Sequence, residues 1–198
     1  MEMPTKDKSR KPRGQEAKAN IERAALTLFG ARGVDAATTR EIAAAAGLSE
    51  GALYRHFPSK DALAESLFFD IHVRLTALVR EAGRKHAAID DQARAIVDAY
   101  CQTADDDWAL FSYHLLTTHR FLPGAPARDN PVAAAEEVVE TAMTRGEIPD
   151  GDARLVTAMA LGVVLQPALH KAYGRIEGSL ARHAETLARG VLAVLHQR

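Results

Sequence analysis

The chain has 198 residues, 47% of them apolar, so it can bury a substantial core, and global disorder is excluded. Alanine is abundant, whereas aromatic residues make up 6% and β-branched residues are sparse, which indicates an all-α protein. The net charge of −1 is unevenly distributed, because residues 1–60 hold 11 Lys and Arg against 7 Asp and Glu and the remainder is acidic. A basic N-terminal part favours a nucleic-acid-binding domain, although ordinary variation in surface charge would also produce it.

The sequence gives no sign of an oxidising compartment or a membrane. Its one cysteine, Cys101, cannot form an internal disulfide and fits a reducing compartment, so we expect a cytoplasmic protein. No signal peptide is predicted, since the polar and basic start is not followed by an apolar run. The longest apolar stretch, Leu155–Leu169, is shorter than a membrane span and contains Gln166 and Pro167, so it predicts a buried helix and no membrane partner.

The N-terminal elements are marked by caps and stops. Residues 1–14 predict a disordered basic arm, which is either a contact to DNA or a solvated tail. Helical spacing of apolar residues predicts a helix over 15–32, which ends at Gly33. Thr38 to Glu41 forms a capping box that begins a short helix ending near Ala46.

A helix-turn-helix is predicted next. Gly47 allows a tight turn, Ser49 caps a third helix that runs to His56 or Phe57, and a fourth, long helix begins near Lys60. The remaining helices are expected over 89–104, 107–120, 128–145, 152–174 and 178–196. We therefore expect a DNA-binding domain over 15–62 and a helical domain over 63–198, with the boundary inside the fourth helix.

The third helix predicts a surface that contacts DNA. Leu53 and Phe57, four residues apart, face the core, and a rotation of about 100° per residue then places the neighbouring residues outward. Small outward residues let the helix approach base edges, and Arg55 can donate two hydrogen bonds to a guanine. Polar residues around the two short helices can reach phosphates.

Together these residues resemble the N-terminal signature of the TetR family of bacterial regulators. The resemblance covers about residues 15–65 and rests on Thr38–Ala43, Ala46–Phe57, Ser59–Lys60 and Leu63. It implies a homodimer formed through the last two helices and a pocket for a small-molecule effector in the C-terminal domain. The DNA contacts that it implies are Thr38, Thr39, Arg40, Glu50, Gly51, Ala52, Tyr54, Arg55, His56 and Lys60.

Glu50 departs from the family pattern, in which this position is often basic or neutral. A carboxylate repels phosphate, so Glu50 either accepts a hydrogen bond from a cytosine amino group or points to solvent.

Four residues are candidates for the wall of a ligand pocket. Trp108 and Phe111 are aromatic, Gln166 precedes a helix-bending proline, and His170 lies one turn further on. The acidic run Asp105–Asp107 beside Trp108 is either part of a cation site or a set of helix caps, and capping is favoured.

Metal binding and catalysis are not expected. His114, His119, His170 and His183 form no ligand-spaced pair and no cysteine cluster accompanies them, so no metal or other cofactor is predicted. No nucleophile–base pair is visible either, so an enzyme is disfavoured.

The C-terminal helix predicts a contact with a second copy. Leu180, Ala184, Leu187, Val191 and Leu195 form an apolar stripe, which either packs on a partner subunit together with Ala160, Leu161, Val164 and Ala168 or belongs to the chain's own core.

The function favoured by these features is ligand-responsive, sequence-specific binding of double-stranded DNA at a near-palindromic operator, with repression of transcription. The alternatives are an activator, a regulator with a protein partner, and a helical scaffold that does not bind DNA.

Overall fold

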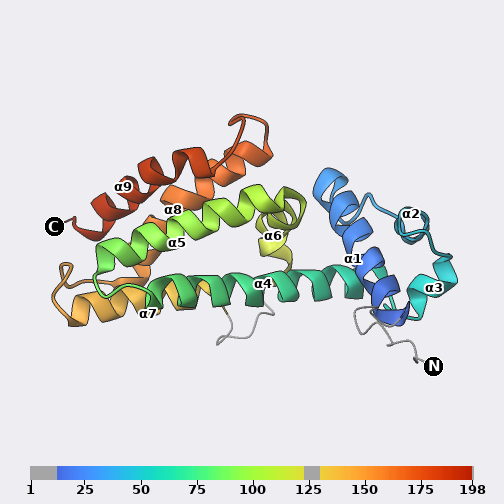
Figure 1. The fold of residues 1–198 in the computed structure, drawn as a ribbon, viewed down its shortest axis with the longest axis horizontal. Coiled ribbons are helices and arrows are strands. Elements are labelled where there is room, and N and C mark those ends of the chain that lie inside the picture. Colours follow the sequence, from blue (N-terminus) through green and yellow to red (C-terminus); the bar gives the residue numbers. More distant parts are fainter. Residues whose placement is uncertain (1–12, 123–129, 198) are drawn as a thin grey trace, which may run out of the picture. The chain divides into compact units, whose positions relative to one another are not determined.

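The structure is a computed structural model that describes residues 13–122 and 130–197, so most of the expected basic arm lies outside it. Helices are the only long elements in these ranges, and the expected all-α class is confirmed (Figure 1). The helices are α1 (Arg13–Arg32), α2 (Thr39–Ala45), α3 (Glu50–Tyr54), α4 (Lys60–Arg84), α5 (Ile89–Asp106), α6 (Trp108–Phe121), α7 (Pro131–Thr144), α8 (Ala153–Ala172), the 3₁₀ turn η2 (Ala181–His183) and α9 (Ala184–Leu195).

The chain divides into two compact units, the first ending at Leu67 and the second beginning at Phe68. The division falls within α4, a few residues after the boundary expected at residue 62. One helix therefore begins in the first unit and continues into the second.

The first unit contains α1, α2 and α3 and the start of α4. Its core includes Ile21 and Phe29 from α1, Ile42 from α2, and Leu53 and Phe57 from the α3 region, all at most 5% exposed. Of these, Leu53 and Phe57 were expected to face the core, and the structure confirms both. Gly33 follows α1 and Gly47 lies in the turn after α2, with φ values of +80° and +70°, which glycine adopts at little steric cost.

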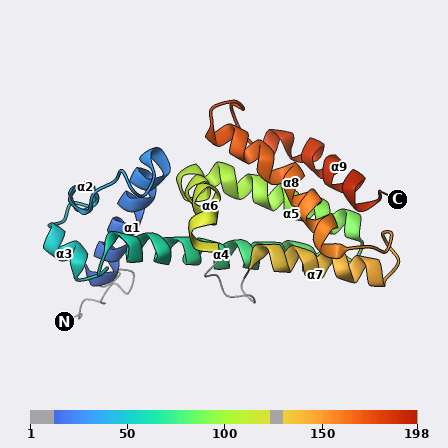
Figure 2. The same ribbon diagram turned by 180° about the vertical axis from the view of Figure 1, so that it is seen from behind.

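The second unit is built from the rest of α4 and the helices that follow. α5 packs against α9, and α8 packs against both α7 and α9 (Figure 2). The α8–α9 contact is close, because a Cβ added at Gly190 would lie 2.8 Å from Val163 Cγ1.

The apolar stripe of α9 belongs to the core of its own chain. The expectation that this stripe binds a partner subunit is therefore wrong. Leu180, Ala184, Leu187, Val191 and Leu195 are at most 9% exposed and pack with Val164 and Ala168 of α8. The stripe therefore fills the interior of the unit itself.

α8 instead exposes another apolar face. Leu155, Met159 and Tyr173 are 58%, 39% and 63% exposed, and Gly162 and Gln166 are exposed at intervening helical positions. Only 17% of the most apolar part of α8 is buried, so the expectation of a buried helix is wrong. Among the described helices, α8 alone has the length and composition of a membrane span, which many soluble proteins also contain.

The acidic run before Trp108 caps α6 and also binds the segment before α9. Asp107 accepts a hydrogen bond from the Leu110 amide and begins α6, as expected. Asp105 instead accepts from Ser179 Oγ at 2.6 Å and from the amides of Leu180 and Ala181, each at 2.9 Å. A residue of α5 therefore fixes the segment that leads into α9.

Candidate nucleic-acid interface

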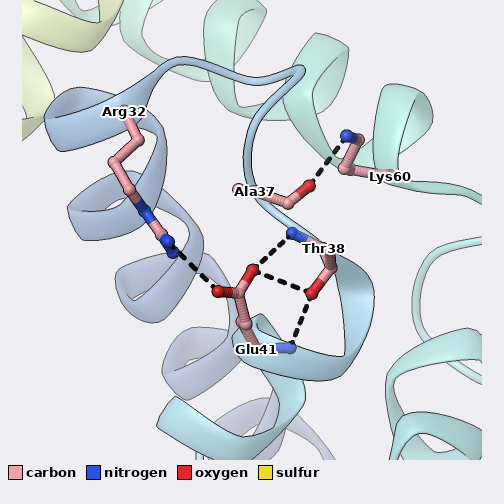
Figure 3. Close-up of polar contacts among 5 residues, drawn as sticks. All are labelled: Arg32, Ala37, Thr38, Glu41 and Lys60. Carbon is pink, nitrogen blue, oxygen red and sulfur yellow. Dashed lines mark hydrogen bonds and ion pairs between the residues drawn. The ribbon is translucent and has the colours of Figure 1, made fainter.

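The N-terminus of α2 is held by the expected capping box. The Thr38 amide donates to Glu41 Oε2 at 2.9 Å, and the Glu41 amide donates to Thr38 Oγ1 at 3.2 Å (Figure 3). The Thr38 hydroxyl also donates to Glu41 Oε2 at 2.8 Å. These bonds occupy the Thr38 side chain and fix where α2 begins.

Glu41 connects the capping box to α1. Its Oε1 lies 3.1 Å from Arg32 Nη1, so the carboxylate bridges two helices. The hydrogen bonds from Thr38, followed by the one from Arg32, lower the pKa of Glu41. The carboxylate is therefore charged at neutral pH, and the orientation of α2 depends on it.

Lys60 contacts the loop before α2. Its Nζ donates to the carbonyl oxygen of Ala37 at 2.8 Å (Figure 3). It also donates to the carbonyl oxygen of Asp35 at 3.2 Å. The sequence predicted that Lys60 binds phosphate, whereas in the structure its ammonium group holds this loop. The phosphate contact stays a prediction.

α3 is short and its inner side is fully packed. Ser49 caps it by accepting from the Ala52 amide at 3.2 Å, and the helix ends at Tyr54, earlier than expected, with the His56 amide donating to Leu53. Ala52 is 7% exposed, so the expectation that it lies on the outer surface is wrong. In a single turn of helix, a residue adjacent to Leu53 still faces the core.

The outer side of α3 carries the other predicted residues. Gly51, Tyr54 and Arg55 are exposed, and His56 is half-buried at the end of the helix. Arg40 is exposed on α2, the other helix of the pair. Gly51 leaves this side of the helix slim, and Tyr54 and Arg55 then add an aromatic ring and a positive charge. This surface therefore has the shape and charge to enter a DNA groove.

The N-terminal ends of α2 and α3 are joined by side chains. Thr39 Oγ1 donates to Glu50 Oε1, and the Tyr54 hydroxyl lies 3.4 Å from Thr39 Oγ1. Glu50 therefore has a partner within the protein, which neither sequence interpretation included.

The structure places the four predicted ligand residues in different surroundings. Phe111 is 2% exposed, and Trp108 stacks on it with ring centroids 5.8 Å apart. Lys171 Nζ lies 4.9 Å from the centre of the Trp108 ring, so a cation of the chain itself occupies that face. Gln166 is exposed on α8, and His170 is half-buried.

Two grooves in the second unit lie elsewhere. One, of about 350 Å³, is lined by residues of α4, α5 and α7 that include Arg80 and Val138. The other, of about 720 Å³, is open and is lined by Glu140, Met143 and the start of α8. Neither groove includes any of the four predicted ligand residues.

A contact between His72 of α4 and His114 of α6 was not predicted from the sequence. The two ring nitrogens lie 3.0 Å apart although the residues are 42 positions apart in the chain. The sequence holds one weak sign that His72 faces inward, because it lies one helical turn after Phe68 and one turn before Thr76, which are both buried.

The first unit is similar to known regulatory proteins. The profile described as "Bacterial regulatory proteins, tetR family" matches residues 21–67. Nucleoid occlusion factor SlmA of Actinobacillus pleuropneumoniae is 40% identical over 65 residues, which cover 33% of this chain and 32% of SlmA. An HTH-type transcriptional repressor of Mycobacterium tuberculosis is 34% identical over 105 residues, which cover 49% of this chain and 56% of that protein.

These matches span between about a third and about half of the curated relatives, whereas the fold extends over nearly the whole chain. FadR of Bacillus subtilis, solved in complex with stearoyl-CoA, superposes with a TM-score of 0.74 over 90% of this chain and 99% of FadR. At 17% identity, this likeness concerns the fold alone.

Proposed function

We propose that the chain is a regulator of the TetR type, which binds a near-palindromic operator as a homodimer, represses transcription and leaves the operator when a small molecule binds. The match of residues 21–67 to the tetR-family profile supports this proposal. The observation that carries the proposal is the outer side of α3. There Tyr54 and Arg55 are exposed while Leu53 and Phe57 anchor the helix from behind. A regulator of this kind acts on DNA in the cytoplasm, so we assign the chain to that compartment.

We assign the base contacts to Arg55 and to Gly51. Gly51 has no side chain, so the backbone of the helix can approach the bases closely there. Arg55, the C-cap of α3, can donate two hydrogen bonds to the O6 and N7 atoms of guanine. Tyr54, His56 and Arg40 lie around it and are assigned to phosphates. Glu50, bonded to Thr39, has a second carboxylate oxygen with which to accept from a cytosine amino group.

A second copy of the chain is proposed to cover the exposed face of α8. Leu155, Met159 and Gly162 follow one another at spacings of four and three residues, and Gly162 has open space where a Cβ would stand. A twofold axis beside this face would bury apolar area on both copies at once. Each copy would then supply one α3.

The ligand is proposed to act through α4. This helix begins with Lys60, which holds the loop before α2, and continues into the second unit. The two half-sites of an operator lie roughly one helical turn, about 34 Å, apart, so a displacement of α4 that changes the separation of the two α3 helices weakens binding. A ligand that favours the non-binding state by a few kcal/mol is sufficient for this switch.

The test is a mobility shift with the purified full chain on genomic fragments, starting with the DNA that flanks its own gene. We expect retardation of a fragment that contains an inverted repeat, with a specific affinity at least ~1000-fold above that for unrelated DNA. Equal affinity for all fragments, or no retardation at all, would favour the scaffold alternative.

Repression is tested separately. A reporter under the control of the retarded fragment should gain expression when the gene for this chain is deleted. Loss of expression would identify an activator instead.

A further inference from the structure

An aromatic cluster between α4 and α6 contains two imidazole rings that the proposed DNA-binding surface does not use. Phe68 is fully buried and stacks on His72, with centroids 5.2 Å apart, and on His114, with centroids 4.7 Å apart. Phe69 and Phe121 lie 5.5 Å and 5.3 Å from Phe68 and complete the cluster. All five residues belong to the second unit.

One nitrogen of this cluster is buried without a partner. His72 is 2% exposed, and its Nδ1 pairs with His114 Nε2 at 3.0 Å. Its other nitrogen, Nε2, has no hydrogen-bond partner among the described residues. Buried polar atoms are almost always hydrogen-bonded in folded proteins, so an incoming polar group would recover free energy at this position.

Both rings are neutral at neutral pH. Burial, followed by the proximity of His72, lowers the pKa of His114 to about 3, and burial also lowers the pKa of His72. A neutral pair has two arrangements. When His114 donates to His72 Nδ1, the proton of His72 is on Nε2, which is then a donor. When His72 donates from Nδ1, its Nε2 is an acceptor.

We infer that His72 Nε2 is the polar anchor of a ligand site in the second unit, and that the ligand is an apolar molecule with one uncharged hydrogen-bonding group, such as a ketone or an alcohol. The inference rests on the proposed function, because it names the anchor and chemical class of the proposed effector. The phenyl rings supply apolar contacts, and the neutral pair matches a carbonyl or a hydroxyl by changing its tautomers. A carboxylate or an ammonium would lose its hydration beside uncharged rings.

The position of the cluster suits both access and regulation. Phe69, His114 and Phe121 are only half-buried, so the cluster reaches the surface of its unit. His72 lies on α4, twelve residues and therefore roughly 18 Å of helix after Lys60. A ligand bonded to His72 acts directly on the helix that the proposed switch displaces.

The test uses the full chain labelled with ¹⁵N-histidine and four probes of similar shape: benzyl alcohol, acetophenone, benzylammonium and benzoate. Long-range ¹H–¹⁵N spectra report the proton and hydrogen-bond state of each ring nitrogen. We expect the alcohol and the ketone to change the His72 Nε2 resonance, in opposite directions, and the two ions to leave it unchanged. His119, exposed on the same helix as His114, is the internal control and should respond to none of the probes.

His72→Phe keeps a ring that can stack on Phe68 and removes the nitrogen. It should weaken binding of benzyl alcohol by about tenfold, whereas His119→Phe should leave it unchanged. If His72→Phe does not fold, the spectra of the unaltered chain decide the question. The inference is overturned if no probe changes the His72 Nε2 resonance, if the ions change it as much as the alcohol does, or if folded His72→Phe binds the alcohol as well as the unaltered chain.

The role in regulation has its own measurement. The alcohol or the ketone, at a saturating concentration, should weaken retardation of the operator fragment, and no change would overturn the role of the site as an effector site. Failure of the proposed function is distinguishable, because it would appear as absent retardation before any probe is added.

Discussion

The polar contacts inside the first unit differ in range from those inside the second unit. In the first unit the main polar contacts join residues close in the chain, such as Thr38 with Glu41 and Thr39 with Glu50. In the second unit they join distant helices: Asp105 contacts residues 74 to 76 positions away, and Arg94 pairs with Glu185, 91 positions away. The outer surface of α3 therefore rests on local motifs, whereas any site in the second unit depends on how the whole unit packs.

The largest expected effect concerns the exposed face of α8. Met159→Glu should convert a dimer into single copies and weaken operator binding at least ~100-fold, because a twofold contact would bury two unpaired charges. Sedimentation velocity measures the first effect and fluorescence anisotropy the second. Leu116→Glu, on α6 at nearly the same exposure (40% against 39%), is the control and should change neither. A Met159→Glu protein that remains dimeric would remove α8 from the interface.

Arg55→Ala tests the surface that depends on local motifs. It should cost about 1–3 kcal/mol on the operator and relax the preference at one base pair, because a bidentate contact to guanine is lost. Binding to a set of operators with single base changes measures both. Arg175→Ala, an exposed arginine in the loop after α8, should behave as the unaltered chain. An unchanged base preference would exclude Arg55 from base recognition.

Asp105 tests the long-range contacts of the second unit. Asp105→Asn should lower the free energy of unfolding by about 1–2 kcal/mol, because three hydrogen bonds lose a charged acceptor. Asp106→Asn is the control, since the exposed Asp106 accepts only from Gln102 in the described structure. Urea unfolding measures both, and equal stability of the two variants would mean that this cap contributes nothing.

The same carboxyl group gives a pH dependence. Burial alone would raise the pKa of Asp105, but the bonds from Ser179 and the two amides, with nearby Lys171, together lower it. The contribution to stability is therefore complete above the unfolded pKa and is lost as the pH falls through the folded pKa. Asp105→Asn should flatten the acid side of the stability curve, and a curve of unchanged shape would contradict this assignment.

The smallest effect is expected for a substitution of Lys60. Lys60→Ala should lower the free energy of unfolding of the first unit by about 1 kcal/mol, because two carbonyl groups lose their donor. If Lys60 also binds the predicted phosphate, the slope of the salt dependence of DNA binding should fall by about one unit in the variant. An unchanged slope would show that the ammonium group serves the loop alone.

The range of these contacts also explains what was predictable from the sequence. The capping box, the turn at Gly47 and the inward Leu53 and Phe57 follow from residues within a few positions, and the structure confirms each. Ala52 was misplaced because the rotation per residue does not show how deeply a single turn of helix is packed.

The errors in the second unit have the same origin. The apolar stripe of α9 predicted that this face is buried. It did not show whether the stripe packs on α8 of the same chain or on a partner subunit. His72 and His114, or Lys171 and Trp108, meet only because distant helices pack together, and no local pattern marks such pairs.

The contact between Lys171 and Trp108 makes the protein its own optical reporter. Trp108 is the sole tryptophan of the chain, so all indole emission arises from one position on α6. An ammonium group held 4.9 Å from that ring alters the electric field on it, and any rearrangement of α6 against the end of α8 changes the field. Rearrangements of this region can therefore be followed in real time without attaching a dye.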